Sequence, residues 1–335
     1  MRIPRSNELD LLRLVLSTSV VFQHSALAGV KTHLPWIERI PAVPLFILLS
    51  GLLVSESYFN STSFSIYIKK RIRRIVPGYL AIVLLGGALL WLTGSALSLP
   101  GSGSIKQLTS YYFFNTIFLN FLHPCVFDAA SFSNVKFCAV NGSLWTIKFE
   151  LAFYLILPAI LVALHKLPKG LSLTASLLLL YGTVLTESIY IQIVACFFAG
   201  VLLSVSRKFW IPAIAKAKVT PRFRIALLLT TAAISGSLLP LPIAVIALLA
   251  ASFVGTKDDS IGLNVLKYGD LSYGIYLIHY PLIQLARFTG IATFIPDVLF
   301  APAFTAMSAL LAIPLYWHVE KRFLPASSHY NQSME

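Results

Sequence analysis

The sequence predicts an all-α integral membrane protein with about ten transmembrane helices and both termini in the cytoplasm. Hydrophobic residues make up 57% of the 335 positions, charged residues make up only 12%, and the mean hydropathy is +0.80. A soluble globular domain carries about twice that share of charged residues. The apolar residues also gather in runs close to the length of about 20 residues that a helix needs to cross a bilayer. The chain is therefore expected to be a polytopic membrane protein.

Ten apolar runs are the candidate spans, and together they form a single domain over residues 1–335. Between the third and fourth runs lies the one long outer loop, at about 95–143, and after the last run comes a cytoplasmic tail at about 318–335. The runs cover approximately residues 10–29, 41–58, 76–94, 144–164, 171–186, 188–205, 224–238, 240–255, 270–289 and 297–317.

The basic residues indicate the orientation of these helices. With the amino terminus inside, the inner segments hold most of the lysines and arginines, including the run from Lys69 to Arg74. Basic loops stay in the cytoplasm, so both termini are expected there and the chain in the inner, cytoplasmic membrane of the cell. The net charge of +13 then reflects topology, and we expect no nucleic-acid partner. Because the first run contains Arg13 and lacks a small-residue cleavage site, we expect a retained span and not a signal peptide.

The first run carries two ionisable residues, Arg13 and His24, inside an otherwise apolar helix. Eleven positions at about 100° per residue bring both side chains to one face, separated by about 16 Å along the axis. Ionisable groups at such depth usually face a protein interior or a water-filled cavity. A buried histidine is often only a packing residue, but an imidazole can also take a proton from a hydroxyl nucleophile. We therefore regard His24 as a candidate general base.

Glu150 is a second ionisable residue inside a predicted span, in the stretch NGSLWTIKFELAFYLILP. This span starts outside, so Glu150 lies about 9–10 Å below the outer surface, at a depth similar to that of His24. Thr146 lies four residues earlier on the same face. A structural carboxylate paired with Lys148 or a hydroxyl is one interpretation, and a partner that orients His24 or stabilises its charged form is the other.

On the inner side, the run YIKKRIRRIVPGY combines a basic patch with a proline, which predicts a helix boundary there. Arg71 and Arg74 are three residues apart and share a face, a geometry that suits phosphate groups. Positive-inside anchoring explains the other basic residues of this run without any ligand.

The outer loop contains an aromatic, amphipathic piece, LTSYYFFNTIFLNFL, which is expected to form an interfacial or re-entrant helix. Cys125 and Cys138 lie in the same loop, on the oxidising side of the membrane. A disulfide between them would stabilise the fold by about 3 kcal/mol in the chain-entropy model, and two free thiols are the alternative. No metal site is expected, because the cysteines and His123 lack a ligand-pair spacing.

Further stretches complete a pattern: VPLFILLSG at 43–51, YGDLSYGIYLIHYPL at 268–282 and WHVEKRF in the last span. With RLVLSTSVVFQH, RIRRIVP and NGSLWTIKFE, they resemble the membrane-bound acyltransferase 3 family in order and spacing along almost the whole chain. The resemblance implies a ten-helix fold that moves an acyl group, most often acetyl, from cytoplasmic acyl-CoA to a hydroxyl of a glycan. The absence of a fused soluble hydrolase-like domain implies the stand-alone form, and Ile47 departs from the family's second phenylalanine.

The resemblance also implies roles for individual residues. Catalysis falls to His24 and Glu150 with Arg13, and acyl-CoA binding to Arg71, Arg74 and Ser50. The family's other motif positions, which would support the site, are Phe46, Gly51, Trp145, Ser272, Tyr273, Tyr276 and His279. Thr146, on the same helix face as Glu150, is a further supporting residue.

The expected reaction has two sides. Acyl-CoA, a substrate and not a permanently bound cofactor, docks from the cytoplasm, and its pantetheine arm enters a cavity lined by Arg13 and Ser50. His24 then activates the acceptor hydroxyl or carries the acyl group itself. The expected partners are acyl-CoA, membrane lipid and a glycan or lipid-linked glycan acceptor, such as a surface polysaccharide or its precursor. A transporter or flippase of a glycan or small solute would also place arginine, histidine and glutamate within ten spans, and a sensing protein is a more distant alternative.

Overall fold

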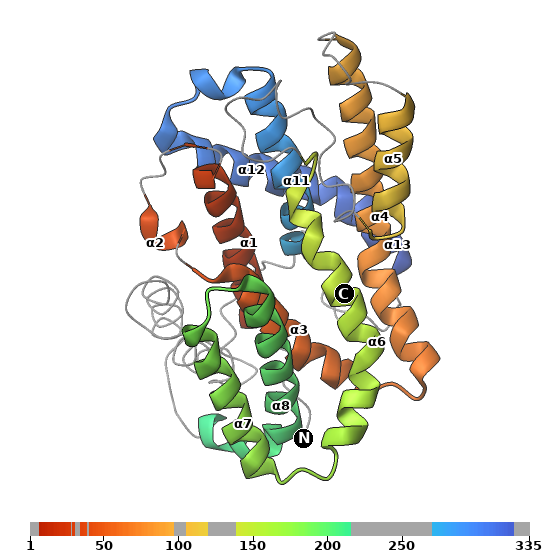
Figure 1. Ribbon diagram of the computed structural model, residues 1–335, viewed down its shortest axis with the longest axis vertical. Coiled ribbons are helices and arrows are strands. Elements are labelled where there is room, and N and C mark those ends of the chain that lie inside the picture. Colours follow the sequence, from red (N-terminus) through yellow and green to blue (C-terminus); the bar gives the residue numbers. More distant parts are fainter. Residues whose placement is uncertain are drawn as a thin grey trace. The chain divides into compact units, whose positions relative to one another are not determined.

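The computed structural model (Figure 1) describes residues 7–27, 29–30, 34–38, 40–96, 105–119, 139–215 and 270–324. Within these ranges every regular element is a helix, which confirms the predicted all-α class. The predicted spans at 224–238 and 240–255, and the predicted disulfide partners Cys125 and Cys138, lie outside the described residues.

The helices follow the apolar runs of the sequence closely. Three of the shorter elements, η3, η4 and η7, are 3-10 helices, and η8 is a π-helical turn. The elements are α1 (Asn7–Leu27), α2 (Pro35–Glu38), α3 (Ala42–Phe59), α4 (Phe64–Ala96), α5 (Ile105–Thr116), η3 (Gly142–Thr146), α6 (Ile147–Leu164), α7 (Lys169–Gly182), η4 (Thr183–Leu185), α8 (Ile189–Ala215), α11 (Leu271–Phe288), η7 (Ile291–Phe294), α12 (Asp297–Leu315), η8 (Tyr316–Glu320) and α13 (Lys321–Phe323).

Five helical segments of the described chain are long and apolar enough to cross a membrane, which makes this a multi-pass membrane protein. They are Ala42–Phe59, Phe64–Leu89, Gly142–Leu164, Ile189–Trp210 and Asp297–Phe323. The predicted span at 171–186 is a shorter apolar helix, Lys169–Leu185, and the last segment continues beyond 317 to Phe323. Helices α1 and α11, with 21 and 18 residues, are long enough to span but carry more polar side chains. The total of ten and the orientation stay predictions.

Helix α4 is continuous through Pro77, so the helix boundary predicted at this proline is wrong. A proline inside a helix removes one backbone hydrogen bond, which neighbouring helices can compensate in a membrane protein. Pro77 has no amide hydrogen to offer the Arg73 carbonyl, and α11 contacts the same turn, where the Tyr273 hydroxyl donates a 2.8 Å hydrogen bond to the Ile75 carbonyl. A Cβ on Gly78 would lie only 3.0 Å from the Tyr273 ring, so the glycine permits this close approach.

The chain divides into two compact units. Described residues of 1–20, 34–69 and 152–268 form the first, and those of 21–33, 70–151 and 269–335 form the second.

In the first unit, α8 packs against both α3 and α7. Gly51 of α3 meets the Phe197 carbonyl, and Gly200 of α8 meets the Leu48 carbonyl, so a methyl group at either glycine would overlap the partner backbone. Two glycines that face each other's helices in this way allow close backbone contact. Glu56 and Arg207, with a 2.8 Å ion pair between Oε1 and Nε, join the same two helices.

In the second unit, α11 packs against α12 and η3, and α5 lies beside α4 (Figure 1). Tyr111 and Tyr112 of α5 fill the space left by Gly86 and Gly87 of α4. Most side chains of α11 between Ser272 and Pro281 are buried, although this helix is rich in polar groups. Buried polar groups need partners, and their partners define the candidate site described next.

Candidate active site

Helix α11 carries the polar residues of the second unit, and its ends follow local sequence signals. Asp270 caps the amino terminus, because its side chain accepts a 3.2 Å hydrogen bond from the Ser272 amide. Gly290, with φ +73°, follows the carboxyl end in the left-handed region that favours glycine. Between these ends, Tyr273, Tyr276 and His279 follow one another at intervals of three and thus share a face.

A pair of histidines joins α1 to α11. The Nδ1 atom of His24 lies 2.7 Å from Nε2 of His279, a hydrogen bond between residues 255 positions apart. The two rings are nearly parallel, with 5.0 Å between their centroids and an interplanar angle of 18°. His279 is fully buried, whereas His24 is partly exposed. Of the two histidines, only His24 is therefore in part accessible from outside the protein interior.

Tyr280 contacts the His24 ring, and Gly142 in turn packs against Tyr280. The edge of Tyr280 meets His24 at 5.1 Å and 83°, and a Cβ on Gly142 would lie 2.6 Å from the Tyr280 ring. Only glycine fits where η3 begins, because the Cβ of any other residue would overlap the Tyr280 ring. The first residue of η3 therefore determines how closely Tyr280 can pack.

A network of buried hydrogen bonds fixes η3 against α11. Asn141 accepts from the Ser143 amide at 3.1 Å, as an N-cap, and its Nδ2 donates to the Leu277 carbonyl at 2.8 Å. The Tyr276 hydroxyl donates to the Ser143 carbonyl at 2.8 Å and lies 2.7 Å from Thr146 Oγ1. The polar motif residues around Thr146 thus connect η3 to the helix that carries His279.

Glu150 lies one helical turn beyond Thr146, on α6. It is close enough to the Tyr276 hydroxyl for an electrostatic interaction. Direct pairing of Glu150 with His24 is not among the contacts of the described residues, where the hydrogen-bond partner of His24 is His279. Trp145 packs its ring edge against Phe149 in the same segment, at 5.9 Å.

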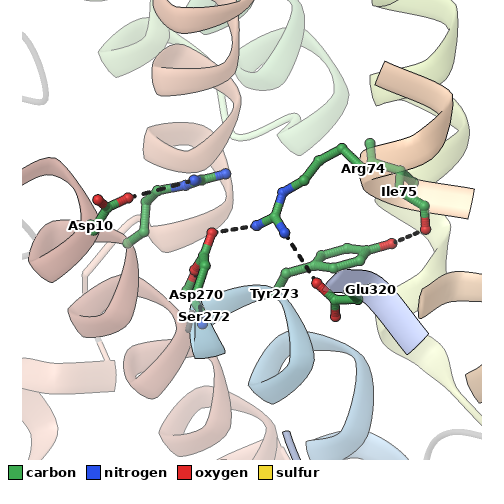
Figure 2. A network of polar contacts seen from close by, with 8 residues as sticks. Asp10, Arg74, Ile75, Asp270, Ser272, Tyr273 and Glu320 are labelled. Carbon is green, nitrogen blue, oxygen red and sulfur yellow. Dashed lines mark hydrogen bonds and ion pairs between the residues drawn. The ribbon is translucent and has the colours of Figure 1, made fainter. Parts of the chain in front are cut away.

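A second polar centre lies at the amino end of α11 (Figure 2). The Arg74 guanidinium forms one ion pair with Asp270 and another, of 3.1 Å, with Glu320. It also lies over the Tyr273 ring, 5.6 Å from the centroid. The side chains of both acids are 2% exposed and that of Arg74 is 12% exposed. This centre joins α4, α11 and the π-helical turn η8.

The second unit also contains the predicted site residues Arg71 and Ser272. Arg71 is half-buried on α4, and Ser272 donates its hydroxyl to Asp270 at 2.5 Å. In the first unit, Arg13 forms a 4.0 Å ion pair with Asp10, and α3 carries three of the predicted residues. These are Phe46, Ser50 and Gly51, of which the first two are half-buried and Gly51 is buried.

Sequence reasoning missed the partners of the predicted residues. Asp270 and Glu320 are acids at the edges of predicted spans, and this position was the one available signal that a basic residue must face them. Asn141 had a signal as well, since asparagine is a preferred N-cap residue directly before a helical run. No sequence signal identified Tyr280 as a neighbour of His24.

The chain was compared with protein families and with known proteins. The acyltransferase 3 family model, described as an acyltransferase domain, matches residues 6–317. An O-acetyl transferase of Shigella phage Sf6 is 29% identical over 97% of this chain and 98% of its own length. Nodulation protein 10 of Rhizobium leguminosarum bv. viciae is 26% identical over 82% of each chain. No solved structure matches the chain. With a family match over nearly its whole length, this membrane protein is an acyltransferase and belongs to the acyltransferase 3 family.

Proposed function

We propose that this protein transfers an acetyl group from cytoplasmic acetyl-CoA to a hydroxyl of a glycan, a surface polysaccharide or its lipid-linked precursor, in the inner membrane. The observation that carries the proposal is the partly exposed His24, whose Nδ1 is bound to a buried partner while no described residue makes a hydrogen bond to its Nε2. The name of the phage relative, an O-acetyl transferase, supports acetyl as the group transferred.

In this reaction His24 acts as the general base. Its Nε2 takes the proton of the acceptor hydroxyl while the oxygen attacks the thioester carbonyl. The carbon–sulfur bond then breaks, and the proton passes from the imidazolium to the departing thiolate. The products are the acyl ester and free CoA, and His24 returns to its neutral form. An acyl group carried on His24 itself is the second route to the same products.

The donor enters from the cytoplasmic side, where the basic part of α4 lies in the proposed topology. Arg71 is half-buried and lies on the same helix face as Arg74, so it is suited to a CoA phosphate. Arg74 already has two carboxylate partners, so we expect it to hold α4 in place beside the donor site and not to bind a phosphate itself. Arg13 and Ser50, from the spans α1 and α3, are proposed to line the path of the pantetheine arm.

Glu150 is proposed to support catalysis from the η3 network. Its carboxylate acts on the same Tyr276 hydroxyl that joins Ser143 and Thr146 to α11. Since Tyr276 lies one turn before His279, Glu150 influences the histidine pair through this helix. Glu150→Gln keeps the size of the side chain and removes its charge, and we expect a lower kcat with little change in the KM for acetyl-CoA.

The test uses the full chain in lipid nanodiscs with acetyl-CoA labelled in the acetyl group. Surface glycans and lipid-linked glycans are compared by mass spectrometry between cells with and without the gene, which identifies the acceptor. Label transfer to that acceptor, with release of free CoA, supports the proposal. Movement of the glycan across the bilayer without consumption of acetyl-CoA would instead identify a transporter or flippase.

A further inference from the structure

We propose that His279 is a positioning residue that holds His24 in a single tautomer, with the hydrogen on Nδ1 and the lone pair of Nε2 available to the acceptor hydroxyl. This inference rests on the proposed role of His24 as the base. It assigns to His279 a task that neither its position in the motif nor the family membership specifies.

The starting point is the backbone contact of His279. Its Nδ1 lies 3.0 Å from the Ile275 carbonyl, one helical turn earlier in α11. A carbonyl oxygen can only accept a hydrogen bond, so Nδ1 of His279 carries a hydrogen. In the neutral ring, the second nitrogen, Nε2, is then an acceptor.

The next contact determines the state of His24. Because Nε2 of His279 accepts, the hydrogen in the 2.7 Å contact comes from Nδ1 of His24. Neutral His24 therefore has its lone pair on Nε2. The opposite assignment requires a charged His279, yet this side chain is 0% exposed and none of the described residues forms an ion pair with it. A buried imidazolium without a counterion is costly, so the neutral relay is favoured.

The same neighbours also fix the ring in space. The hydrogen bond to the nearly parallel ring of His279 sets the plane of His24, and the perpendicular contact with Tyr280 limits its rotation. When Nε2 takes a proton, the Nδ1 hydrogen bond to His279 becomes charge-assisted and stronger. His279 thus stabilises the imidazolium while adding no charge of its own to the membrane interior. An orienting carboxylate performs the same task in the serine hydrolase triad, but at the cost of burying a charge.

The test compares His279→Gln, whose side-chain oxygen reaches the position of Nε2 and can accept from His24, with His279→Leu, which cannot accept. Acetyl transfer is measured in nanodiscs with the full chain, as kcat and as the KM for acetyl-CoA. We expect His279→Leu to lower kcat by about 10- to 100-fold, the value of one hydrogen bond to a charged group, with an unchanged KM. His279→Gln should recover most of that loss. His165→Gln, at an exposed histidine of the first unit, is the matched control.

The tautomer itself is read by solid-state NMR on the ¹⁵N-histidine-labelled protein, with His24→Gln used to assign the signal. We expect an unprotonated Nε2 and a protonated Nδ1 on His24 in the wild type, and loss of this single tautomer in His279→Leu. The wild-type spectrum is decisive even if His279→Leu does not fold. A protonated Nε2 on neutral His24 would overturn the proposal, and so would equal kcat losses in the Leu and Gln variants with the tautomer intact. Full activity of His24→Ala would instead overturn the proposed function.

Discussion

Helix α11 carries two polar centres of opposite character, about 14 Å apart by the helical rise between Asp270 and His279. At its amino end, the guanidinium of Arg74 is bound by two carboxylates from other parts of the chain. Nine residues further on, His279 and His24 form a contact between two rings, one of which is partly exposed. The first centre is charged and its guanidinium is paired with two carboxylates, whereas the second contains a neutral ring that is partly exposed.

This difference assigns a structural role to one centre of α11 and a catalytic role to the other. A charged group inside a membrane protein is stable only when it is paired, and once paired it has little capacity left for a ligand. The Arg74 centre therefore fits the role of a joint between α4, α11 and η8. A histidine can stay neutral in the same surroundings and still accept a proton during the reaction. The four predictions below test this division of roles.

His24→Ala should have the largest effect. The variant removes the proposed base, so we expect transfer to fall by about 10²–10⁴-fold, the usual contribution of general acid–base catalysis. Initial rates with labelled acetyl-CoA measure the loss, and a single symmetrical peak in size-exclusion chromatography shows that the variant is folded. If most of the activity survives in folded His24→Ala, the chemistry does not belong to the histidine pair.

Arg74→Leu should act on stability and not on the donor. Its removal leaves Asp270 and Glu320 as two buried carboxylates without their shared cation, a change that costs about 3–5 kcal/mol when one partner of a buried pair is lost. Thermal unfolding in detergent measures the effect, and Arg74→Lys, which keeps the charge but not the planar fork, should lie between. A stable Arg74→Leu protein with a raised KM for acetyl-CoA would instead support the role predicted from the sequence, in which Arg74 binds a phosphate of the donor.

The fold was predictable where one helix is one apolar run. The predicted spans 41–58, 144–164 and 297–317 agree closely with the helices, because hydropathy and helical length depend only on local sequence. Pro77 misled the prediction for α4, since its effect depends on whether another helix contacts the weakened turn, and here Tyr273 does. Tertiary contacts of this kind leave no mark in the sequence of the helix itself.

The site was predictable as a set of residues but not as a set of pairs. Glu150 was predicted as the neighbour of His24 because both residues lie at a similar depth in the membrane. Depth gives the height of a residue along its helix, but it does not give the direction in which the side chain points around that helix. The structure instead brings His279 to His24 across 255 positions. Similarly, Arg71 and Arg74 share a helix face, yet the partners of Arg74 come from segments about 200 and 250 residues away. Helical periodicity places a side chain on a face and cannot say which helix that face meets.

Arg71→Ala should have a smaller effect than loss of either centre. If Arg71 holds a phosphate of the donor, the lost charge-assisted contact is worth about 1.5–3 kcal/mol, so the KM for acetyl-CoA should rise by about 10- to 100-fold with little change in kcat. Steady-state kinetics over a range of donor concentrations give both constants. Arg73→Ala, an exposed arginine of the same helix, is the control and should leave the KM unchanged. Equal effects of the two variants would indicate general attraction of an anion to the basic surface.

Tyr276→Phe is expected to have the smallest effect, and it tests whether the η3 network supports the histidine centre from a distance. The change keeps the buried ring and removes the hydroxyl that donates to the Ser143 carbonyl and contacts Thr146. Thr146 Oγ1 also lies 3.4 Å from that carbonyl, so the carbonyl retains a donor and the cost should stay near 1 kcal/mol, within the usual value of one hydrogen bond. Thermal unfolding in detergent measures this cost against Tyr181→Phe, at an exposed tyrosine of α7 where the change should have almost no effect.

Because Tyr276 lies one turn before His279, we also expect Tyr276→Phe to cause a modest fall in kcat at an unchanged KM. A normal kcat in a destabilised Tyr276→Phe protein would show that the network holds η3 in place without influencing the histidines.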